Sequence, residues 1–280
     1  MTNFPPITVL GGGEYGSAIV YTLFKAGLPV VLVVKSSELY LRRPVCFAEA
    51  IHSGLQQIDD VSAVLVDENV LMNFESDALN VKWKKAVQFH IQTQQIPVVI
   101  LEELPDFVEI LQPEYIVRTD RTLFPGITME SAPLVIGLHP VHTIYQHCNL
   151  SIESRQNYFI GDVYVTPPDS EKLTNFDFHF FKQPWETINS PLEGVFISSK
   201  NIGDNIARNE SLGKIEDIEI RSPFDGQIWG LYHSGKIISV SKPLGLIYQG
   251  PPTEAYHSFS FAHKVVAGTA LREILHFRRF

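Results

Sequence analysis

Three glycines near the start of the chain have the spacing that phosphate binding requires. Gly11, Gly13 and Gly16 fit the pattern G-x-G-x-x-G, directly after an apolar run at residues 7–10 and before a stretch with helical spacing of apolar residues. The first glycine permits a tight turn, the second lets a diphosphate approach the backbone, and the third lets helix and strand pack closely. N–H groups at the start of such a helix attract an anion. The motif therefore predicts a dinucleotide-type phosphate site.

Basic side chains follow the second predicted strand, at residues 28–34. The next residues, 35–38, read Lys-Ser-Ser-Glu, so the acid that holds the ribose hydroxyls in NAD sites is missing from its usual place. Lys35, Arg42 and Arg43 offer positive charge for a 2′-phosphate, which favours NADP. Because the two arginines are adjacent, we expect one to bind the anion and the other to form an internal ion pair. The alternative is a domain whose nucleotide site is vestigial.

A group of soft-metal ligands follows a later predicted strand. His139, His142, His147 and Cys148 lie within a short segment, but their spacing matches no recognised zinc pattern. We therefore predict no metal site and interpret these histidines as polar residues around a loop that can line a cleft. Cys46 lies between two apolar residues, which is typical of a buried, inert thiol.

The elements that position these residues are predicted from hydrophobic periodicity. Apolar runs that read as strands alternate with segments of helical spacing. The strands are expected at residues 7–10, 28–34, 63–66, 98–101, 115–117 and 134–137, and the helices at residues 17–26, 77–94 and 105–111. This alternation predicts an α/β fold, a Rossmann-like doubly wound parallel sheet, whose ligands would bind beyond the carboxyl ends of the strands.

The C-terminal half contains an internal repeat with an offset of 32 residues. S-P-x-[DE]-G occurs at residues 190–194 and 222–226, and L-G-x-I at residues 212–215 and 244–247. Two such halves can interlock and close each other's strand edges. We predict a β barrel-sandwich that resembles the hammerhead modules of biotinyl and lipoyl domains. The connection at residues 215–220 lacks the lysine that those carriers modify, so we predict no swinging arm.

Composition sets the wider limits. A chain of 280 residues predicts about two domains, and we place a Rossmann-like domain at 1–142, a connecting segment at 143–188, the β module at 189–250 and a C-terminal helical segment at 251–280. The formal charge of −9 argues against nucleic acid and anionic membranes as partners. With two cysteines, no apolar leader and no run long enough to cross a bilayer, we expect a cytoplasmic protein.

Residues 41–54, L-R-R-P-V-C-F-A-E-A-I-H-S-G, resemble a motif of one protein family. These are the accessory proteins of the selenium-dependent molybdenum hydroxylase system, which are related to the xanthine dehydrogenase accessory factors. Residues 131–138, 152–154 and 268–275 resemble the family in the same order along the chain. The resemblance implies a maturation protein that handles molybdopterin or a nucleotide for a molybdenum hydroxylase.

Within this resemblance, Pro140 and Glu153 keep the family's pattern, whereas the glycines that flank Pro140 in the family are replaced. Glu153 is our candidate for a base or a hydrogen-bond acceptor in the cleft, with a structural acceptor for backbone N–H groups as the alternative. We expect residues 11–16, the two arginines and residues 140–153 to bind a phosphorylated ligand. Two alternatives stay open: an NADP-dependent oxidoreductase, and a non-catalytic interaction protein with a degenerate site. The sequence also leaves open whether the protein catalyses a reaction and whether it forms a homo-oligomer.

Overall fold

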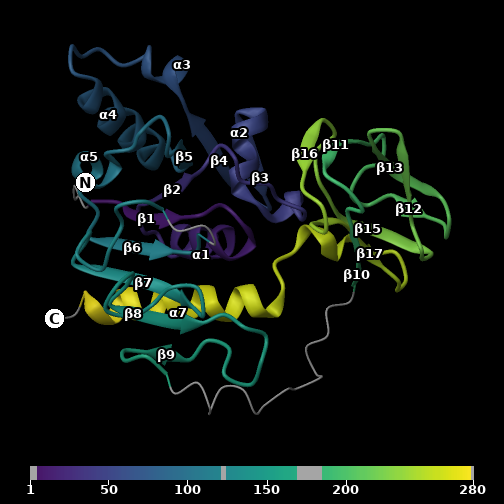
Figure 1. Ribbon diagram of the computed structural model, residues 1–280. Coiled ribbons are helices and arrows are strands. Elements are labelled where there is room, and N and C mark those ends of the chain that lie inside the picture. The colour runs from purple at the N-terminus through teal and green to yellow at the C-terminus, as the bar shows by residue number, and fades with distance from the viewer. Residues whose placement is uncertain (1–4, 121–123, 169–184, 279–280) are drawn as a thin grey trace. The chain divides into compact units, whose positions relative to one another are not determined.

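The computed structural model describes residues 5–120, 124–168 and 185–278 (Figure 1). The chain divides into two units. The N-terminal unit comprises Met1–Glu38, Cys46–His179 and Phe259–Phe280, and the C-terminal unit comprises Leu39–Val45 and Phe180–Ser258. A short segment from the first part of the chain therefore belongs to the C-terminal unit.

The N-terminal unit is built on a nine-stranded sheet with the order β3-β4-β5-β2-β1-β6-β7-β8-β9. Its strands are β1 (Ile7–Leu10), β2 (Val30–Val34), β3 (Leu55–Ile58), β4 (Val61–Val66), β5 (Ile96–Ile100), β6 (Tyr115–Arg118), β7 (Leu134–His139), β8 (Leu150–Glu153) and β9 (Val163–Tyr164). All neighbours from β4 to β8 are parallel. At the two edges, β3 and β9 pair antiparallel with β4 and β8. The inner strands are almost wholly apolar because both faces of a parallel sheet are covered.

Helices cover this sheet and supply its core. They are α1 (Glu14–Lys25), α2 (Ala50–Ser53), α3 (Glu68–Leu71), α4 (Leu79–Gln92), α5 (Phe107–Leu111) and α7 (Phe261–Phe277). Trp83 of α4 and Phe107 of α5 pack with strand residues such as Val33 and Val99 in one core cluster. Helix α7 packs against α1 and β8, so the end of the chain completes the unit (Figure 1). Within the described ranges, no helix combines the length and the apolar character needed to cross a membrane.

The C-terminal unit contains two four-stranded antiparallel sheets. Its strands are β10 (Trp185–Asn189), β11 (Gly194–Ile197), β12 (Asn205–Ile206), β13 (Ser211–Ile215), β14 (Ile218–Arg221), β15 (Gly226–Leu231), β16 (Lys236–Ile238) and β17 (Pro243–Tyr248). The sheet orders are β10-β17-β15-β12 and β14-β13-β11-β16. An offset of 32 residues maps β10 to β13 onto β14 to β17, and it maps one sheet order onto the other. Each sheet thus combines two strands from each copy of the repeat.

The core of the C-terminal unit follows the same repeat. The buried pairs related by 32 residues are Ile188 and Ile220, Phe196 and Ile228, Ile206 and Ile238, Leu212 and Leu244, and Ile215 and Ile247. Both members of each pair belong to one hydrophobic cluster between the two sheets. Neither copy could bury its apolar face alone, because half of the strands in each sheet come from the other copy.

The predicted fold class, a Rossmann-like doubly wound parallel sheet followed by a barrel-sandwich module, is wrong. The large sheet is mixed, with an antiparallel strand at each edge, and the C-terminal strands form two separate antiparallel sheets. The edge strands escaped prediction because β3 reads Leu-Gln-Gln-Ile and is partly exposed, and β9 contains only Val163 and Tyr164. The predicted boundaries also differ from the observed units. The segment assigned to 143–188 supplies β8 and β9, and the final helix belongs to the N-terminal unit.

Candidate functional site

The carboxyl ends of the parallel strands form the edge where a ligand would bind in such a sheet. Four of the predicted site elements lie there: the glycine turn after β1, Lys35 after β2, Pro140 after β7 and Glu153 at the end of β8. The peptide bond between His139 and Pro140 is cis. We call this edge of the N-terminal unit the carboxyl edge.

The glycine turn is built so that two of its positions accept only glycine. Gly11 has a φ of +94°, and a Cβ there would lie 2.8 Å from the backbone nitrogen of Asp120. A Cβ on Gly16 would lie 1.9 Å from the carbonyl oxygen of Gly11, because α1 leaves the turn in direct contact with it. The buried hydroxyl of Ser17 donates to the carbonyl of Gly12 at 3.1 Å and accepts from the N–H of Phe47 at 2.9 Å. The turn is therefore fixed from both sides.

Gly13 differs from the other two glycines. It is the N-cap of α1, its φ is −66°, and a Cβ would meet nothing within 4 Å. Gly13 has no side chain of its own to cap the first turn of this helix. There is thus room beside the N-terminus of α1, where the helix dipole favours an anion.

Two carboxylates reduce the positive character of this place. Glu38 Oε2 accepts a hydrogen bond from the N–H of Gly12 at 3.3 Å, and Glu14 lies in the first turn of α1. The sequence prediction treated the acid after β2 as missing, but the chain bends back after β2 and brings Glu38 to the glycine turn. Lys35 places its ammonium 4.7 Å from the ring centroid of Phe124. A phosphate at Gly13 would meet both signs of charge.

Arg42 and Arg43 belong to the C-terminal unit. Arg42 is 2% exposed, donates to the carbonyl of Ser258 at 2.9 Å, and lies 5.2 and 5.8 Å from the ring centroids of Trp185 and Trp229. The anion-binding role that we predicted for this pair gains no support from these contacts, which use the planar guanidinium for stacking and for backbone carbonyls.

Arg43 also binds inside the C-terminal unit. It donates from Nε to the carbonyl of Leu231 at 2.8 Å, and its Nη1 lies 2.8 Å from His233 Nδ1. Burial lowers the pKa of His233 to about 4, and the positive charges of Arg43 and Lys236 act in the same direction. The imidazole is therefore neutral near pH 7 and can accept from the guanidinium.

A buried ion-pair network lies beside the glycine turn at the carboxyl edge. Asp120 accepts from Arg118 Nη2 at 3.0 Å, from the N–H of Phe124 at 2.8 Å, and contacts His142 Nε2 at 3.2 Å. Burial acts to raise the pKa of Asp120, but hydrogen bonds from His142 and Arg118 outweigh it, so the pKa is lowered. His142 Nδ1 accepts from the N–H of Leu138 at 3.0 Å. Both ring nitrogens of His142 are thus used within the protein, which leaves neither for a metal.

The other two histidines of this group, His147 and His139, have different partners. His147 Nδ1 accepts from the N–H of Thr143 at 3.1 Å and so closes its own turn. His139 packs edge-on against Tyr164 with ring centroids 5.4 Å apart. Burial lowers the pKa of His139, and the positive charge of Arg155 adds to this while Glu153 opposes it. Cys148 is a buried thiol whose pKa is raised by burial to about 11, so it is no nucleophile at neutral pH.

Glu153 is fully buried and strongly paired. Arg155 donates to it from Nε at 3.0 Å and from Nη2 at 2.7 Å, and the Tyr164 hydroxyl donates at 3.4 Å. His139 Nε2 lies 4.0 Å from Glu153 Oε2. Burial and Glu153 together raise the pKa of Tyr164 to about 12. A bidentate guanidinium holds both carboxylate oxygens, and the N–H of Arg155 also binds one of them, so this arrangement fits the structural alternative better than a general base.

A hydrogen-bonded chain links this pair to the glycine turn. The Tyr15 hydroxyl, in the first turn of α1, donates to the carbonyl of Ser154 at 2.6 Å. The Ser154 hydroxyl donates to the carbonyl of His139 at 2.6 Å. Tyr15 also packs edge-on against His263 of α7, with centroids 4.5 Å apart. The carboxyl edge is therefore a connected surface that spans α1, β7, β8 and α7.

Comparisons with known proteins give one relative in sequence. The uncharacterized protein YqeB of Escherichia coli strain K12 is 22% identical over 275 residues, which cover 96% of this chain and 47% of the relative. The chain spans about half the length of this curated relative. No family model matches the chain.

Solved structures show only faint likenesses. The product-bound ectoine utilization protein EutE (DoeB) of Ruegeria pomeroyi has 10% identity and a TM-score of 0.24, with 88% of this chain and 86% of that chain covered. A succinylglutamatedesuccinylase/aspartoacylase of Rhodobacter sphaeroides has 11% identity and a TM-score of 0.23, with 87% and 86% covered. Likenesses at such TM-scores carry no argument about fold or chemistry.

Three residues of the carboxyl edge were missed by the sequence prediction. Asp120 and Arg155 each lie two residues from a partner of opposite charge, at the carboxyl ends of β6 and β8. That spacing at a strand end was the available signal. Glu38 gave a weaker signal, because only the bend after β2 brings it back to the glycine turn.

Proposed function

We propose that this chain is a cytoplasmic accessory protein for the maturation of a molybdenum hydroxylase, and that its glycine turn binds a phosphorylated ligand such as molybdopterin or a nucleotide. The family resemblance of residues 41–54 supports the maturation role. Two buried cysteines, Cys46 and Cys148, remain thiols, as a reducing compartment requires.

One observation carries the ligand site. The turn at Gly11 and Gly16 is closed so tightly that it has no room for a side chain, yet a Cβ on Gly13, the N-cap of α1, would meet no atom within 4 Å. This leaves room for an anion beside the N-terminus of α1, where the helix dipole favours negative charge. The backbone N–H groups suit a phosphate, whereas the negative charges of Glu38 and Glu14 repel it.

The test uses Gly13, where a side chain fits without strain. In Gly13→Asp a carboxylate takes the anion's place, whereas Gly13→Asn adds a neutral side chain of the same size. Both residues are good N-caps, so neither variant should lose stability. We expect pyrophosphate, ADP or NADPH to bind the wild-type chain saturably in calorimetric titration, with affinity at least about tenfold lower in Gly13→Asp than in Gly13→Asn.

Absence of saturable binding at millimolar concentration, or equal binding by the two variants, would contradict the proposal. Mass spectrometry of the natively purified protein identifies the ligand itself. A retained molybdopterin would favour the maturation role over an NADP-dependent oxidoreductase. For the latter, no contact within the described residues offers support, since Arg42 is used in the C-terminal unit.

A second candidate is a non-catalytic interaction protein with a degenerate ligand site. The observation in its favour is Glu38, whose carboxylate is hydrogen-bonded to the glycine turn where a ligand oxygen would otherwise bind. In that case Gly13→Asp would leave hydroxylase maturation in cells unchanged while the chain binds none of the three probes. Loss of maturation in Gly13→Asp, with Gly13→Asn active, would exclude this candidate.

A further inference from the structure

The two sheets of the C-terminal unit have outer faces that the repeat makes equivalent, but the described residues cover only one of them. On sheet β10-β17-β15-β12, Trp229 and Leu246 are 6% and 7% exposed. They pack in a cluster with Tyr256, Leu41 and other residues of the same unit. The segment Leu39–Val45 lies here, and the carbonyl of Leu41 accepts from the N–H of Leu231 at 2.9 Å.

By contrast, apolar side chains on the outer face of sheet β14-β13-β11-β16 are exposed to solvent. Val195 and Ile237 are direct cross-strand neighbours and are 37% and 68% exposed, and Ile197 on the same face is 43% exposed. Isolated apolar residues on a surface are ordinary, but neighbours on one sheet face indicate an interaction surface. We call Val195, Ile197 and Ile237 the open face.

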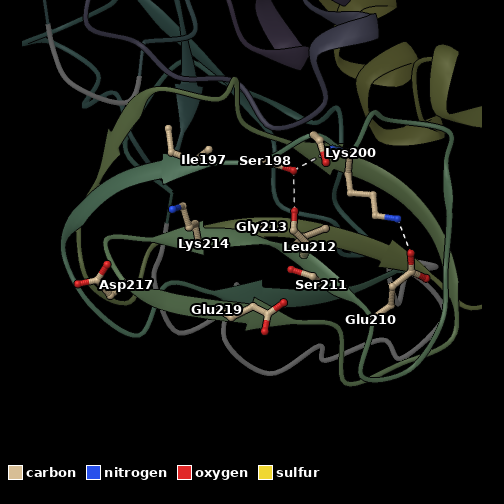
Figure 2. Close-up of a pocket in the computed structure, with 11 residues that line it drawn as sticks. Ile197, Ser198, Lys200, Glu210, Ser211, Leu212, Gly213, Lys214, Asp217 and Glu219 are labelled. Atoms are coloured by element: carbon tan, nitrogen blue, oxygen red, sulfur yellow. Dashed lines mark hydrogen bonds and ion pairs between the residues drawn. The ribbon is translucent and has the colours of Figure 1, made fainter.

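A shallow hollow of about 620 Å³ adjoins the open face (Figure 2). It is lined by Ile197, Ser198, Ser199, Lys200, Glu210, Ser211, Leu212, Gly213, Lys214, Asp217 and Glu219. Gly213 has no side chain to fill the hollow. A larger residue would not fit here, because its Cβ would lie 2.6 Å from the carbonyl oxygen of Ile197. Figure 2 shows Lys200 directed to Glu210, with which it forms an ion pair. Glu219 is paired with Arg221.

The repeat indicates what the hollow would hold. On the covered face, the guanidinium of Arg42 lies over Trp185 and Trp229. Residues 32 positions away correspond to them on the other sheet: Asp217 to Trp185, and Ile197 to Trp229. Asp217 forms no ion pair with any residue in the described part of the chain. On the covered face the indole rings attract the guanidinium, and on the open face the carboxylate of Asp217 would attract a basic side chain by its charge.

We propose that the open face and its hollow dock an extended segment of a partner protein, with a basic side chain against Asp217 and an apolar side chain against Ile197 and Ile237. The covered sheet shows this pairing within one chain, where Leu41 and Arg42 are adjacent residues of one segment. An acidic chain with a formal charge of −9 favours a basic partner segment in the same way. This docking role is independent of the ligand at the glycine turn.

The experiment titrates fluorescein-labelled synthetic peptides of alternating leucine and arginine into the full chain, with fluorescence anisotropy as the readout. A matched peptide set carries glutamate in place of arginine. We expect saturable binding of the arginine set alone. Ile237→Lys and Asp217→Lys should each weaken it about tenfold or more, because they remove an apolar contact and reverse a charge.

The matched control is Asn205→Lys, which places the same charge at the exposed position that the repeat relates to Ile237 on the other sheet. It should leave the affinity within about twofold of the wild type. All three positions are exposed, and thermal melting checks that the variants fold. If Ile237→Lys failed to fold, Asp217→Asn would replace it.

Binding of both peptide sets, or equal effects of Asn205→Lys and Asp217→Lys, would overturn the proposal. So would sedimentation showing a dimer that Ile237→Lys dissociates, because the occupant would then be a second copy of this chain.

Discussion

At the scale of single residues, two buried carboxylates of the carboxyl edge, Asp120 and Glu153, are held by several partners each. Asp120 receives four hydrogen bonds, from Arg118, His142 and the N–H of Phe124, while being only 1% exposed. Glu153 is held by a bidentate arginine in the same manner. A buried charge is tolerated only when it is paired in this way, so each network depends on all its members.

Asp120→Asn should therefore destabilise the fold strongly. The substitution leaves the buried guanidinium of Arg118 without its counter-charge, and we expect a loss of about 3 to 5 kcal/mol in the free energy of unfolding. Urea denaturation followed by far-UV circular dichroism measures it. The control is Asp60→Asn at the exposed ion pair with Lys25, which should cost far less because water screens both charges. Similar losses in both variants would show that the buried network contributes no more than a surface pair.

His233 should make stability depend on pH. Its pKa is about 4 in the folded chain, against 6.5 for an unperturbed histidine. Between these values the unfolded chain binds more protons than the folded one, so stability falls as pH decreases from about 6.5 to 4. His233→Gln keeps a polar neighbour for Arg43 but cannot titrate. Urea denaturation across this pH range should show a shallower loss in the variant, and an unchanged slope would exclude His233 as a source.

At the scale of elements, the glycine turn and α1 show how a local motif is fixed by distant chain. The third glycine of the motif is needed because α1 begins in contact with the carbonyl of Gly11, and the hydroxyl of Thr119 donates to that carbonyl at 3.0 Å. The motif was visible in the sequence, and the tight turn at Gly11 and the close packing at Gly16 follow its predicted reasons, whereas the predicted approach of a diphosphate at Gly13 stays a prediction. Its neighbour Glu38 was not visible, because a residue beyond the strand end has no fixed position until the loop folds.

Gly16→Ala should be costly. The added Cβ would lie 1.9 Å from a backbone oxygen, so α1 or β1 must shift, and we expect about 3 kcal/mol of destabilisation or a failure to fold. Gly268→Ala gives the opposite sign as a control. It adds a Cβ at an exposed position of α7 that meets nothing within 4 Å, and should stabilise by about 0.5 to 1 kcal/mol. Equal thermal stability of Gly16→Ala and wild type would contradict the packing described at the turn.

At the scale of the whole molecule, two devices organise the chain. The C-terminal unit is a duplication whose copies exchange strands, so that each sheet needs both copies. The N-terminal unit is completed by α7 from the end of the chain, and Leu39–Val45 is contributed to the C-terminal unit from near the start. Each unit is therefore assembled from segments that are far apart in sequence, as expected when only long-range contacts bury the apolar faces.

The duplication predicts equal costs at equivalent core positions. Ile206 and Ile238 are 3% and 1% exposed and lie in the same cluster, related by the repeat. Ile206→Ala and Ile238→Ala should each cost about 2 to 5 kcal/mol and agree within about 1 kcal/mol, because the cavities are lined by equivalent residues. Urea denaturation of both variants checks this. A much larger cost at one position would show that the two copies have diverged in their packing.

The sequence by itself determined the elements whose signal is local. Continuous apolar runs indicated the inner parallel strands, since a strand buried on both faces has no polar alternation, and the 32-residue repeat identified the duplicated strands. Tertiary structure decided the rest: the antiparallel edges that make the sheet mixed, the return of Glu38 to the glycine turn, and the destination of Arg42. The physical reason is that a charged side chain is placed by its partners. Arg42 is bound by a carbonyl 216 residues away, a distance over which composition and spacing carry no information.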